Sequence, residues 1–306
     1  MRNLFGRLLL VIFLVISVSW LAHARTGDNF TVNEHENVSG EDCDRHFDIS
    51  SDLPLERAQE DRTIAPNSIS KLRISGLRNG GIQVVGWERN EIFVRACKAA
   101  AAYNRSEAKS ILDHIKLEVR GGDVTVSGLE RRQSWVHLLV RVPKQIAMEV
   151  ETHNGPLSLR GITAKALDAQ AVNGPVSLED CTGKIVVEVQ NGPVSLVRSS
   201  GDIRLRAQNG PMSVELDKAW QGEGLEASTR NGPLELKIPE RYGSGVEVRA
   251  DGHSPFACEL DACQGATKDW DNDSRSVRFG QPGQATIVRL STVNGPVSIE
   301  RARTTF

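Results

Sequence analysis

The sequence is poor in aromatic residues and has no excess of charge of either sign. Phe, Tyr and Trp make up 5% of its 306 residues, so the exposed rings that commonly form a carbohydrate-binding platform have few candidates. Lysine and arginine together number 37 against 39 aspartates and glutamates, for a net charge of −2. Nucleic-acid and anionic-lipid binders carry clustered Lys and Arg. The balance therefore argues against both of these partner classes.

Long apolar runs are lacking beyond the N-terminus. Arg2 and Arg7 precede one apolar run over 8–20, and Ala22-His23-Ala24 then offers small residues at the positions that a signal peptidase reads. The run is shorter than the roughly 20 apolar residues of a membrane span. We therefore predict that residues 1–24 are a signal peptide and that the chain is exported, to the periplasm, the cell surface or the medium. An uncleaved N-terminal anchor is the alternative.

Cleavage would remove two arginines and leave 35 basic against 39 acidic residues, a net charge of −4. We expect no transmembrane helix in the chain that remains, because no later segment is long and apolar enough.

Cysteine is scarce and odd in number, with five residues in the chain. Export to an oxidising compartment allows disulfides, and Cys258 and Cys263 are close enough in the sequence to pair. The odd count leaves at least one thiol unpaired within the chain. Cys181 lies at an expected turn and suits a small buried residue.

The chain changes character near residue 63. Residues 25–62 are polar and acidic with little periodicity, and such composition buries too little apolar area to offset chain entropy. We predict a flexible tether there, with one short strand near Phe47, followed by one domain over 63–306. In that domain apolar and polar residues alternate as in strands, except over 104–115. There Asn104, Glu107 and apolar residues at helical spacing predict a short helix.

A repeated tripeptide predicts the fold. Asn-Gly-Pro occurs six times, and the first five copies are spaced by 19, 18, 18 and 22 residues, a period typical of stacked repeats. Apolar residues stand six and four positions before each Asn and three and five after it, apolar residues or threonine stand two before it, and the residues between are mostly polar. Gly and Pro suit a sharp corner. The expected structural corners are Asn154, Gly155, Pro156, Asn173, Gly174, Pro175, Asn191, Gly192, Pro193, Asn209, Gly210, Pro211, Asn231, Gly232, Pro233, Asn294, Gly295 and Pro296.

Each copy therefore forms a strand, a corner and a second strand, with one set of side chains pointing inward. A single coil cannot bury its apolar side alone, so several must stack. We predict an all-β fold, a parallel β-solenoid or β-roll of 18–22-residue repeats, with the helix near 104–115 and a loop insertion at about 250–284. An antiparallel β-sandwich is the rival fold, but it does not require one corner tripeptide at near-constant spacing.

Two segments carry a family resemblance. Residues 79–84 (Asn-Gly-Gly-Ile-Gln-Val) and 86–94 (Gly-Trp-Glu-Arg-Asn-Glu-Ile-Phe-Val) resemble the opening repeat of the bacterial "putative-adhesin" domain of unknown function, and the Asn-Gly-Pro repeats that follow are similar too. The resemblance covers about 65–300. It implies an exported β-solenoid at the surface or in the periplasm, with no established catalytic residues. The cysteine-bearing insertion between Lys237 and Thr286 departs from the family pattern.

Two columns of polar residues are candidates for function. Serines share one repeat position. They could form a polar ladder that binds a repetitive ligand, but the favoured interpretation is an outward strand position where small hydroxyls bond across coils. Glu149 and Asp168 also share one position, and stacking would bring them to about the 5 Å separation of retaining glycosidases. Glu151, Glu188 and Arg204 nearby favour a solvated, mixed-charge face. The serine column is Ser158, Ser177, Ser195, Ser213 and Ser298, with Glu235 in the remaining copy.

Other reactive chemistry has little support. The Gly-x-Ser-x-Gly elbow of serine hydrolases is absent. Asp269, Asp271 and Asp273 alternate as in a calcium loop, but Ser274 and Gly280 stand where that loop needs Gly and Glu. We expect no cofactor, no metal and no enzyme activity. The sequence predicts an adhesin-like structural or interaction module with an unidentified protein or glycan partner. The alternatives are a polysaccharide-acting β-helix enzyme using the stacked carboxylates and an envelope regulatory sensor.

Overall fold

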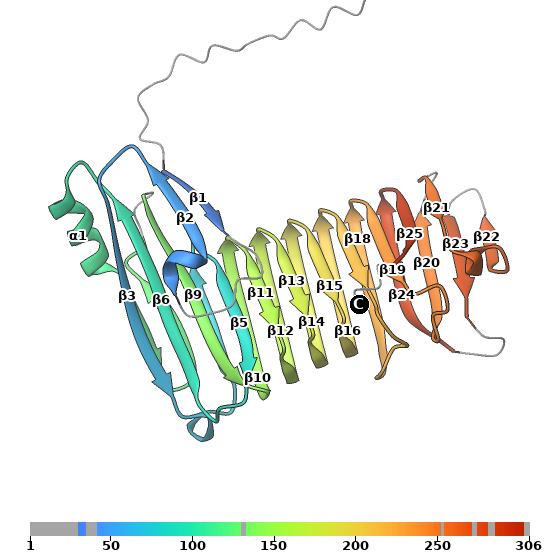
Figure 1. Cartoon of the computed structure of the whole chain (residues 1–306), viewed down its shortest axis with the longest axis horizontal. Coiled ribbons are helices and arrows are strands. Elements are labelled where there is room, and N and C mark those ends of the chain that lie inside the picture. The colour runs from blue at the N-terminus through green and yellow to red at the C-terminus, as the bar shows by residue number, and fades with distance from the viewer. Residues whose placement is uncertain are drawn as a thin grey trace, which may run out of the picture.

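Two long sheets face each other along the whole length of the protein in the computed structural model (Figure 1). The structure describes residues 30–34, 42–129, 133–251, 254–270, 274–280 and 285–302. The predicted signal peptide, 1–24, lies outside these residues. Within them, one sheet has twelve strands and the other has eleven. No helix in these ranges is long and apolar enough to cross a membrane.

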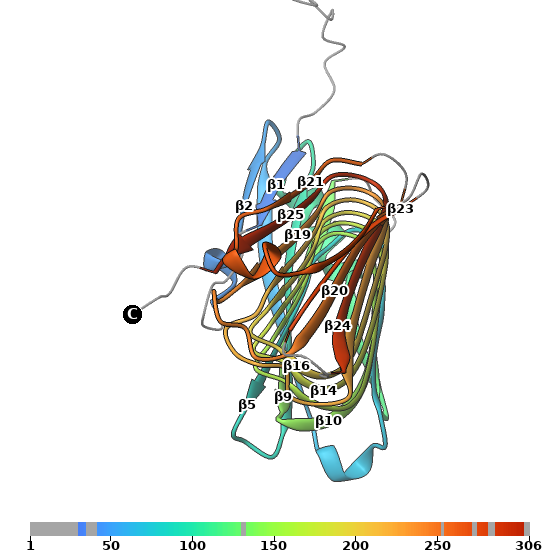
Figure 2. The ribbon, with the colours of Figure 1, turned by 90° about the vertical axis from the view of Figure 1, so that its right-hand side faces the viewer.

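The repeats form the middle of both sheets. Each repeat gives a long strand to the twelve-stranded sheet, turns at Asn-Gly-Pro, and gives a short strand to the eleven-stranded sheet. Viewed along the long axis, the two sheets form opposite walls of each coil (Figure 2). The repeat strands are β10 (Gln145–Asn154), β11 (Leu157–Arg160), β12 (Thr163–Asn173), β13 (Val176–Glu179), β14 (Thr182–Asn191), β15 (Val194–Val197), β16 (Ser200–Asn209), β17 (Met212–Glu215), β18 (Gly224–Asn231) and β19 (Leu234–Ile238).

Successive coils pair in parallel and in the register that the tripeptide predicts. Asn154 is the register partner of Asn173, which precedes Asn191 and Asn209 in the same column. The predicted parallel β-solenoid, with one repeat per coil, is therefore confirmed. Its inward columns are buried in one continuous core, including Met148, Val150, Leu157, Leu159, Leu167, Leu178, Ile185, Val187, Leu196, Ile203, Leu205, Leu225, Leu236, Val288 and Ile299.

The N-terminal end is closed by antiparallel strands and by the single α-helix of the described residues. The predicted helix is confirmed: the Asn104 side chain accepts a hydrogen bond from the Glu107 backbone N–H at 2.9 Å, and the helix buries Ala108, Ile111 and Leu112 against the core. The elements here are β3 (Leu55–Ile64), η2 (Pro66–Ser68), β4 (Leu72–Leu77), β5 (Ile82–Trp87), β6 (Ile92–Ala101), α1 (Arg105–His114), β7 (Lys116–Arg120), β8 (Asp123–Ser127) and β9 (Ser134–Pro143).

The tether predicted over 25–62 is wrong for most of its length. Strand β3 pairs antiparallel with β6 over ten residues, although of its side chains only Ile64 is buried. Backbone pairing to a strand held by the core replaces the apolar burial that this segment lacks. The charges of β3 are those of a protected sheet edge: Asp61 forms a two-bond ion pair with Arg95 at 2.7 and 2.8 Å.

A hairpin with a disulfide precedes β3 and lies over the outer face of the eleven-stranded sheet (Figure 1). It consists of β1 (Phe30–Glu34), η1 (Cys43–Arg45) and β2 (Phe47–Ser51). Cys43 is bonded to Cys97 of β6, and Phe47 packs in a small cluster with Leu139 of β9. Nothing in the sequence pattern indicates this pairing of Cys43 with Cys97.

At the C-terminal end, the order of the strands in the sheets differs from their order in the chain. The last repeat, β24 (Thr286–Asn294) and β25 (Val297–Arg301), packs directly on β18 and β19, and Asn294 follows Asn231 in the corner column. The segment predicted as a loop insertion, about 250–284, contains several strands and lies beyond this last repeat, where together with β20 it extends and closes the solenoid (Figure 1). Its elements are β20 (Gly245–Asp251), β21 (Phe256–Cys258), η3 (Asp261–Cys263), β22 (Thr267–Trp270) and β23 (Ser274–Phe279).

The unpaired thiol of Cys181 is fully buried at the second corner of its coil. Its Sγ donates toward the backbone oxygens of Leu159 and Glu179, both at 3.4 Å. Burial raises the pKa of Cys181 to about 11, from 9.0 in its ordinary state. The thiol therefore stays protonated in the folded protein at pH values where an exposed one ionises.

Cys181 is expected to make the protein less stable as pH rises from about 9 to about 11. Because the thiol ionises at lower pH in the unfolded chain, rising pH lowers the free energy of the unfolded state first. At about 1.4 kcal/mol per unit of pKa difference, the loss reaches about 2 kcal/mol. Urea unfolding at several pH values measures it, and Cys181→Ala should flatten the curve in this window. Parallel curves for the two proteins would show that the thiol does not contribute.

Candidate functional site

The Asn-Gly-Pro corners form a hydrogen-bonded column. Each Asn donates its side-chain N–H to the side-chain oxygen of the Asn in the preceding coil: Asn173 to Asn154 at 2.8 Å and Asn191 to Asn173 at 3.0 Å, and the column continues to Asn294. The Gly N–H groups bond the Asn carbonyls of the next coil at 2.9 Å. The Asn side chains and the Gly N–H groups thus form their hydrogen bonds with the corners of neighbouring coils. The corner column therefore joins coils, as its sequence position suggests.

Steric fit explains the glycine of the corner. At Gly192, which has φ of +150°, an added Cβ would lie 2.1 Å from the backbone oxygen of Gly174 in the neighbouring coil. The coils approach so closely here that only hydrogen fits at this position.

The serine column lies on the outer face of the eleven-stranded sheet. Ser158, Ser177, Ser195 and Ser213 are successive register partners, and all are half-buried between fully buried inward neighbours. At the end of the row the Ser213 hydroxyl donates to Glu235 at 2.8 Å. The column is thus a continuous row of hydroxyls on a flat face, with neighbours one strand spacing apart, about 4.8 Å.

Glu149 and Asp168 are register partners on the outer face of the twelve-stranded sheet. Lys71 bridges them, with its Nζ 2.8 Å from Glu149 Oε2 and 3.5 Å from Asp168 Oδ2. The hydrogen bond from Lys71 lowers the pKa of Glu149. Both carboxylates remain about half exposed, at 46% and 49%. A glycosidase acid needs a raised pKa, so Glu149 has the opposite electrostatics.

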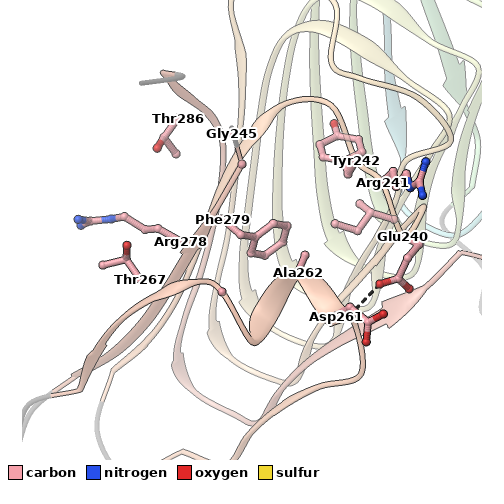
Figure 3. Close-up of a pocket in the computed structure, with 13 residues that line it drawn as sticks. Glu240, Arg241, Tyr242, Gly245, Asp261, Ala262, Thr267, Arg278, Phe279 and Thr286 are labelled. Atoms are coloured by element: carbon pink, nitrogen blue, oxygen red, sulfur yellow. Dashed lines mark hydrogen bonds between the residues drawn. The ribbon is translucent and has the colours of Figure 1, made fainter. Parts of the chain in front are cut away.

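A hollow of about 720 Å³ lies at the C-terminal end, between β20, β23 and the η3 turn (Figure 3). Glu240 accepts a hydrogen bond from the Asp261 N–H at 2.8 Å and one from Arg301 Nε at 2.9 Å. The Asp261 N–H bond is the main cause of the lowered pKa of Glu240. Burial raises the pKa of the Tyr242 phenol to about 12. The charged groups of this hollow fasten the end of the solenoid and lack the arrangement of a reactive centre.

Cys258 and Cys263 form a disulfide in this same end region and close the η3 turn. Among the described residues, no three His, Cys, Asp or Glu side chains gather in a way that would hold a metal ion. Two of the acids considered for calcium, Asp271 and Asp273, lie outside the described residues.

Comparisons with known proteins found one family model and several solved structures that match the chain. The model of the Toastrack DUF4097 family matches residues 40–300. No curated protein matches the chain. Among solved structures, a "putative cell adhesion protein" from Clostridium sporogenes is 15% identical, with 81% of this chain and 100% of that chain covered and a TM-score of 0.33.

Two further solved structures come from other bacteria. A "putative adhesin" from Bacteroides fragilis is 11% identical, with 80% of this chain and 97% of that chain covered and a TM-score of 0.32. A "putative lipid binding protein" from Parabacteroides distasonis is 10% identical, with the same coverages and a TM-score of 0.36. The family model matches by far the greater part of the sequence, including every Asn-Gly-Pro repeat. The chain belongs to the Toastrack DUF4097 family.

Proposed function

We propose that this protein is an exported, non-enzymatic interaction module that presents the polar outer faces of its two sheets to a glycan or to a protein of the cell envelope. The observation that carries the proposal is the regularity of these faces. Polar side chains repeat in register from coil to coil, as in the serine row from Ser158 to Ser213. A flat ladder of this kind suits an extended partner with its own repeat. Export rests on the signal-like residues 1–24.

The electrostatics of the carboxylate pair support the non-enzymatic part of the proposal. Hydrolysis of a glycosidic bond needs one carboxyl group held protonated by a desolvated setting. Glu149 is instead half exposed and held ionised by Lys71. Reactive carboxyl groups often stand out by a raised pKa, whereas the pKa of Glu149 is lowered.

The full chain is expected to retain an envelope polysaccharide or protein and to release it intact. The experiment incubates the chain with isolated envelope polysaccharides, then measures the bound fraction by sedimentation and any new reducing ends or unsaturated products. A matched variant, Glu149→Gln with Asp168→Asn, should bind as the natural chain does and also give no products. Products that form with the natural chain and disappear with this variant would establish the enzyme instead.

A further inference from the structure

A hollow of about 390 Å³ lies on the outer face of the twelve-stranded sheet, over the adjacent strands β16, β18, β24 and β20. Arginines from three of these strands line it together with two serines. Its strands come from chain segments as far apart as 200–209 and 286–294. The hollow therefore forms only because the last repeat packs on β18 and precedes β20 in the sheet. Its lining includes Arg204, Arg206, Ser228, Arg249, Arg289 and Ser291.

The register explains why the face is hollowed at this place. Arg206, Ser228, Ser291 and Arg249 occupy one row across four neighbouring strands. At about 4.8 Å per strand the row is about 14 Å long. Two short hydroxyl side chains thus form a floor between two long guanidinium side chains, and Arg289 stands beside this floor on β24.

The hollow carries positive charge that its own acids neutralise only in part. Four lining arginines face two lining glutamates, Glu226 and Glu247, which leaves a net charge of +2. Glu247 is already bound to Arg278 at 2.7 Å. Arg289 is exposed, and no acid within the described residues forms an ion pair with it at 4.0 Å or less.

The other three arginines have acidic partners on the open surface. Arg204 is paired with Glu226 at 3.5 Å, Arg206 with Glu188 at 3.6 Å and Arg249 with Asp251 at 2.9 Å. Exposed pairs of this kind contribute little to stability. A ligand anion can therefore displace these partners at small cost.

The same rows carry acids in the N-terminal coils. The rows that hold the arginines on β16 hold Glu149 and Glu151 on β10, Asp168 on β12 and Glu188 on β14. Glu149 and Asp168 are paired with Lys71, so this part of the face has mixed charge, and the excess of arginine lies in the hollow. The balanced charge of the sequence gives no sign of a basic cluster. The four arginines lie in three separate segments of the chain, which only the fold brings together.

We propose that this hollow binds an acidic polysaccharide, with Arg206, Arg249 and Arg289 holding its anionic groups and with Ser228 and Ser291 contacting sugar hydroxyls. The inference rests on the proposed function and specifies its partner. Guanidinium groups form paired hydrogen bonds with carboxylate or sulfate. A row about 14 Å long with charge at both ends and hydroxyls between them matches a chain in which charged and hydroxyl groups recur. A single small anion would contact only one end of it.

The test measures binding of fluorescent oligosaccharides of equal length to the full chain. Oligogalacturonate supplies carboxylates, a heparin oligosaccharide supplies sulfates, and a maltooligosaccharide is neutral. The variant Arg249→Glu with Arg289→Glu reverses charge in the hollow. Arg120→Glu makes the same kind of change on β7, the edge strand at the opposite end of the same sheet. Circular dichroism verifies that the variants are folded.

At least one acidic oligosaccharide should bind the natural chain and Arg120→Glu with Kd values within twofold of each other. The hollow variant should weaken this binding at least tenfold, and raising NaCl from 50 to 200 mM should weaken it severalfold. The acidic sugar that binds more tightly identifies the anionic group. The neutral oligosaccharide should bind far more weakly than either.

Three results would overturn the proposal: no binding of either acidic oligosaccharide, an unchanged Kd in the hollow variant, or equal affinity for polyglutamate of the same charge. The first two leave the proposed function standing with a different partner or a different face, and the third makes the hollow a general polyanion site. Cleavage of the bound sugar would instead contradict the non-enzymatic function itself.

Discussion

Gly192→Ala is expected to lower the free energy of unfolding by about 4 kcal/mol and to separate neighbouring coils at their corner. The new Cβ would lie 2.1 Å from a backbone oxygen of Gly174, and backbone atoms cannot move aside as a side-chain end can. Overpacking costs about 1–3 kcal/mol, and a non-glycine residue at φ near +150° costs a further 1–3 kcal/mol. Relief requires breaking the 2.9 Å bond from the Gly174 N–H to the Asn191 carbonyl oxygen, which joins the same two coils.

Gly161→Ala is the matched control, because it makes the same chemical change at the other corner. Gly161 also has positive φ, +62°, but an added Cβ there has no heavy atom within 4 Å. The equivalent positions of the next two coils are Asp180 and Arg198, at φ of +53° and +47°. The control should therefore cost only about 1 kcal/mol.

Urea unfolding followed by circular dichroism measures both corner variants. With m of about 3 kcal/mol/M for a chain of this size, Gly192→Ala should lower the midpoint by more than about 1 M, and Gly161→Ala by less than about 0.5 M. Equal midpoints for the two variants would mean that the close approach of coils at the Asn-Gly-Pro corner does not limit the choice of residue.

The parts of the fold that depend on neighbouring residues in the chain could be predicted from the sequence. The helix at 105–114 follows from its N-cap and its apolar spacing, both of which are local. The coil follows from a corner tripeptide that marks the same register in each copy. In both cases the interacting residues lie within about 20 positions of each other, so a pattern in the sequence can reveal them.

The parts that depend on long-range pairing could not be predicted. Strand β3 buries little, and its stability comes from pairing with β6. The Cys43–Cys97 disulfide joins residues 54 apart, and nothing in the spacing of these cysteines selects that pair. The segment after Ile238 interrupts the repeats in sequence, yet β18 and β24 are neighbours in space.

The same distinction between local and long-range features applies to the candidate site. The serine row and the Glu149–Asp168 pair were found because they recur at one repeat position. The arginine hollow was missed because Arg249 belongs to the interrupting segment, which has no copy of the tripeptide to fix its register. Aligning the sixth copy directly after the fifth would have placed Arg289 beside Glu226, which is where the structure has it.

Val187→Asp is expected to unfold the solenoid, at a cost of several kcal/mol at pH 7. Val187 is fully buried in β14, with Ala169 and Leu205 as its register partners on both sides. A carboxylate there finds only aliphatic neighbours and no hydrogen-bond donor, so it loses its hydration without compensation. Glu188→Ala, one residue away, should change stability by only about 0.5 kcal/mol. Glu188 is 53% exposed and its pair with Arg206 at 3.6 Å is a surface pair.

The pH dependence of Val187→Asp separates a buried charge from a simple loss of packing. Desolvation raises the pKa of a buried carboxyl above its unfolded value of about 3.9. The folded state then binds a proton that the unfolded state releases, so the penalty is present above pH 4 and shrinks as pH falls toward that value. Val187→Ala, which only creates a cavity, should show no such recovery relative to the natural chain. Urea midpoints measured from pH 7 to pH 4 test this, and equal recovery of the two variants would mean that side chain 187 faces water.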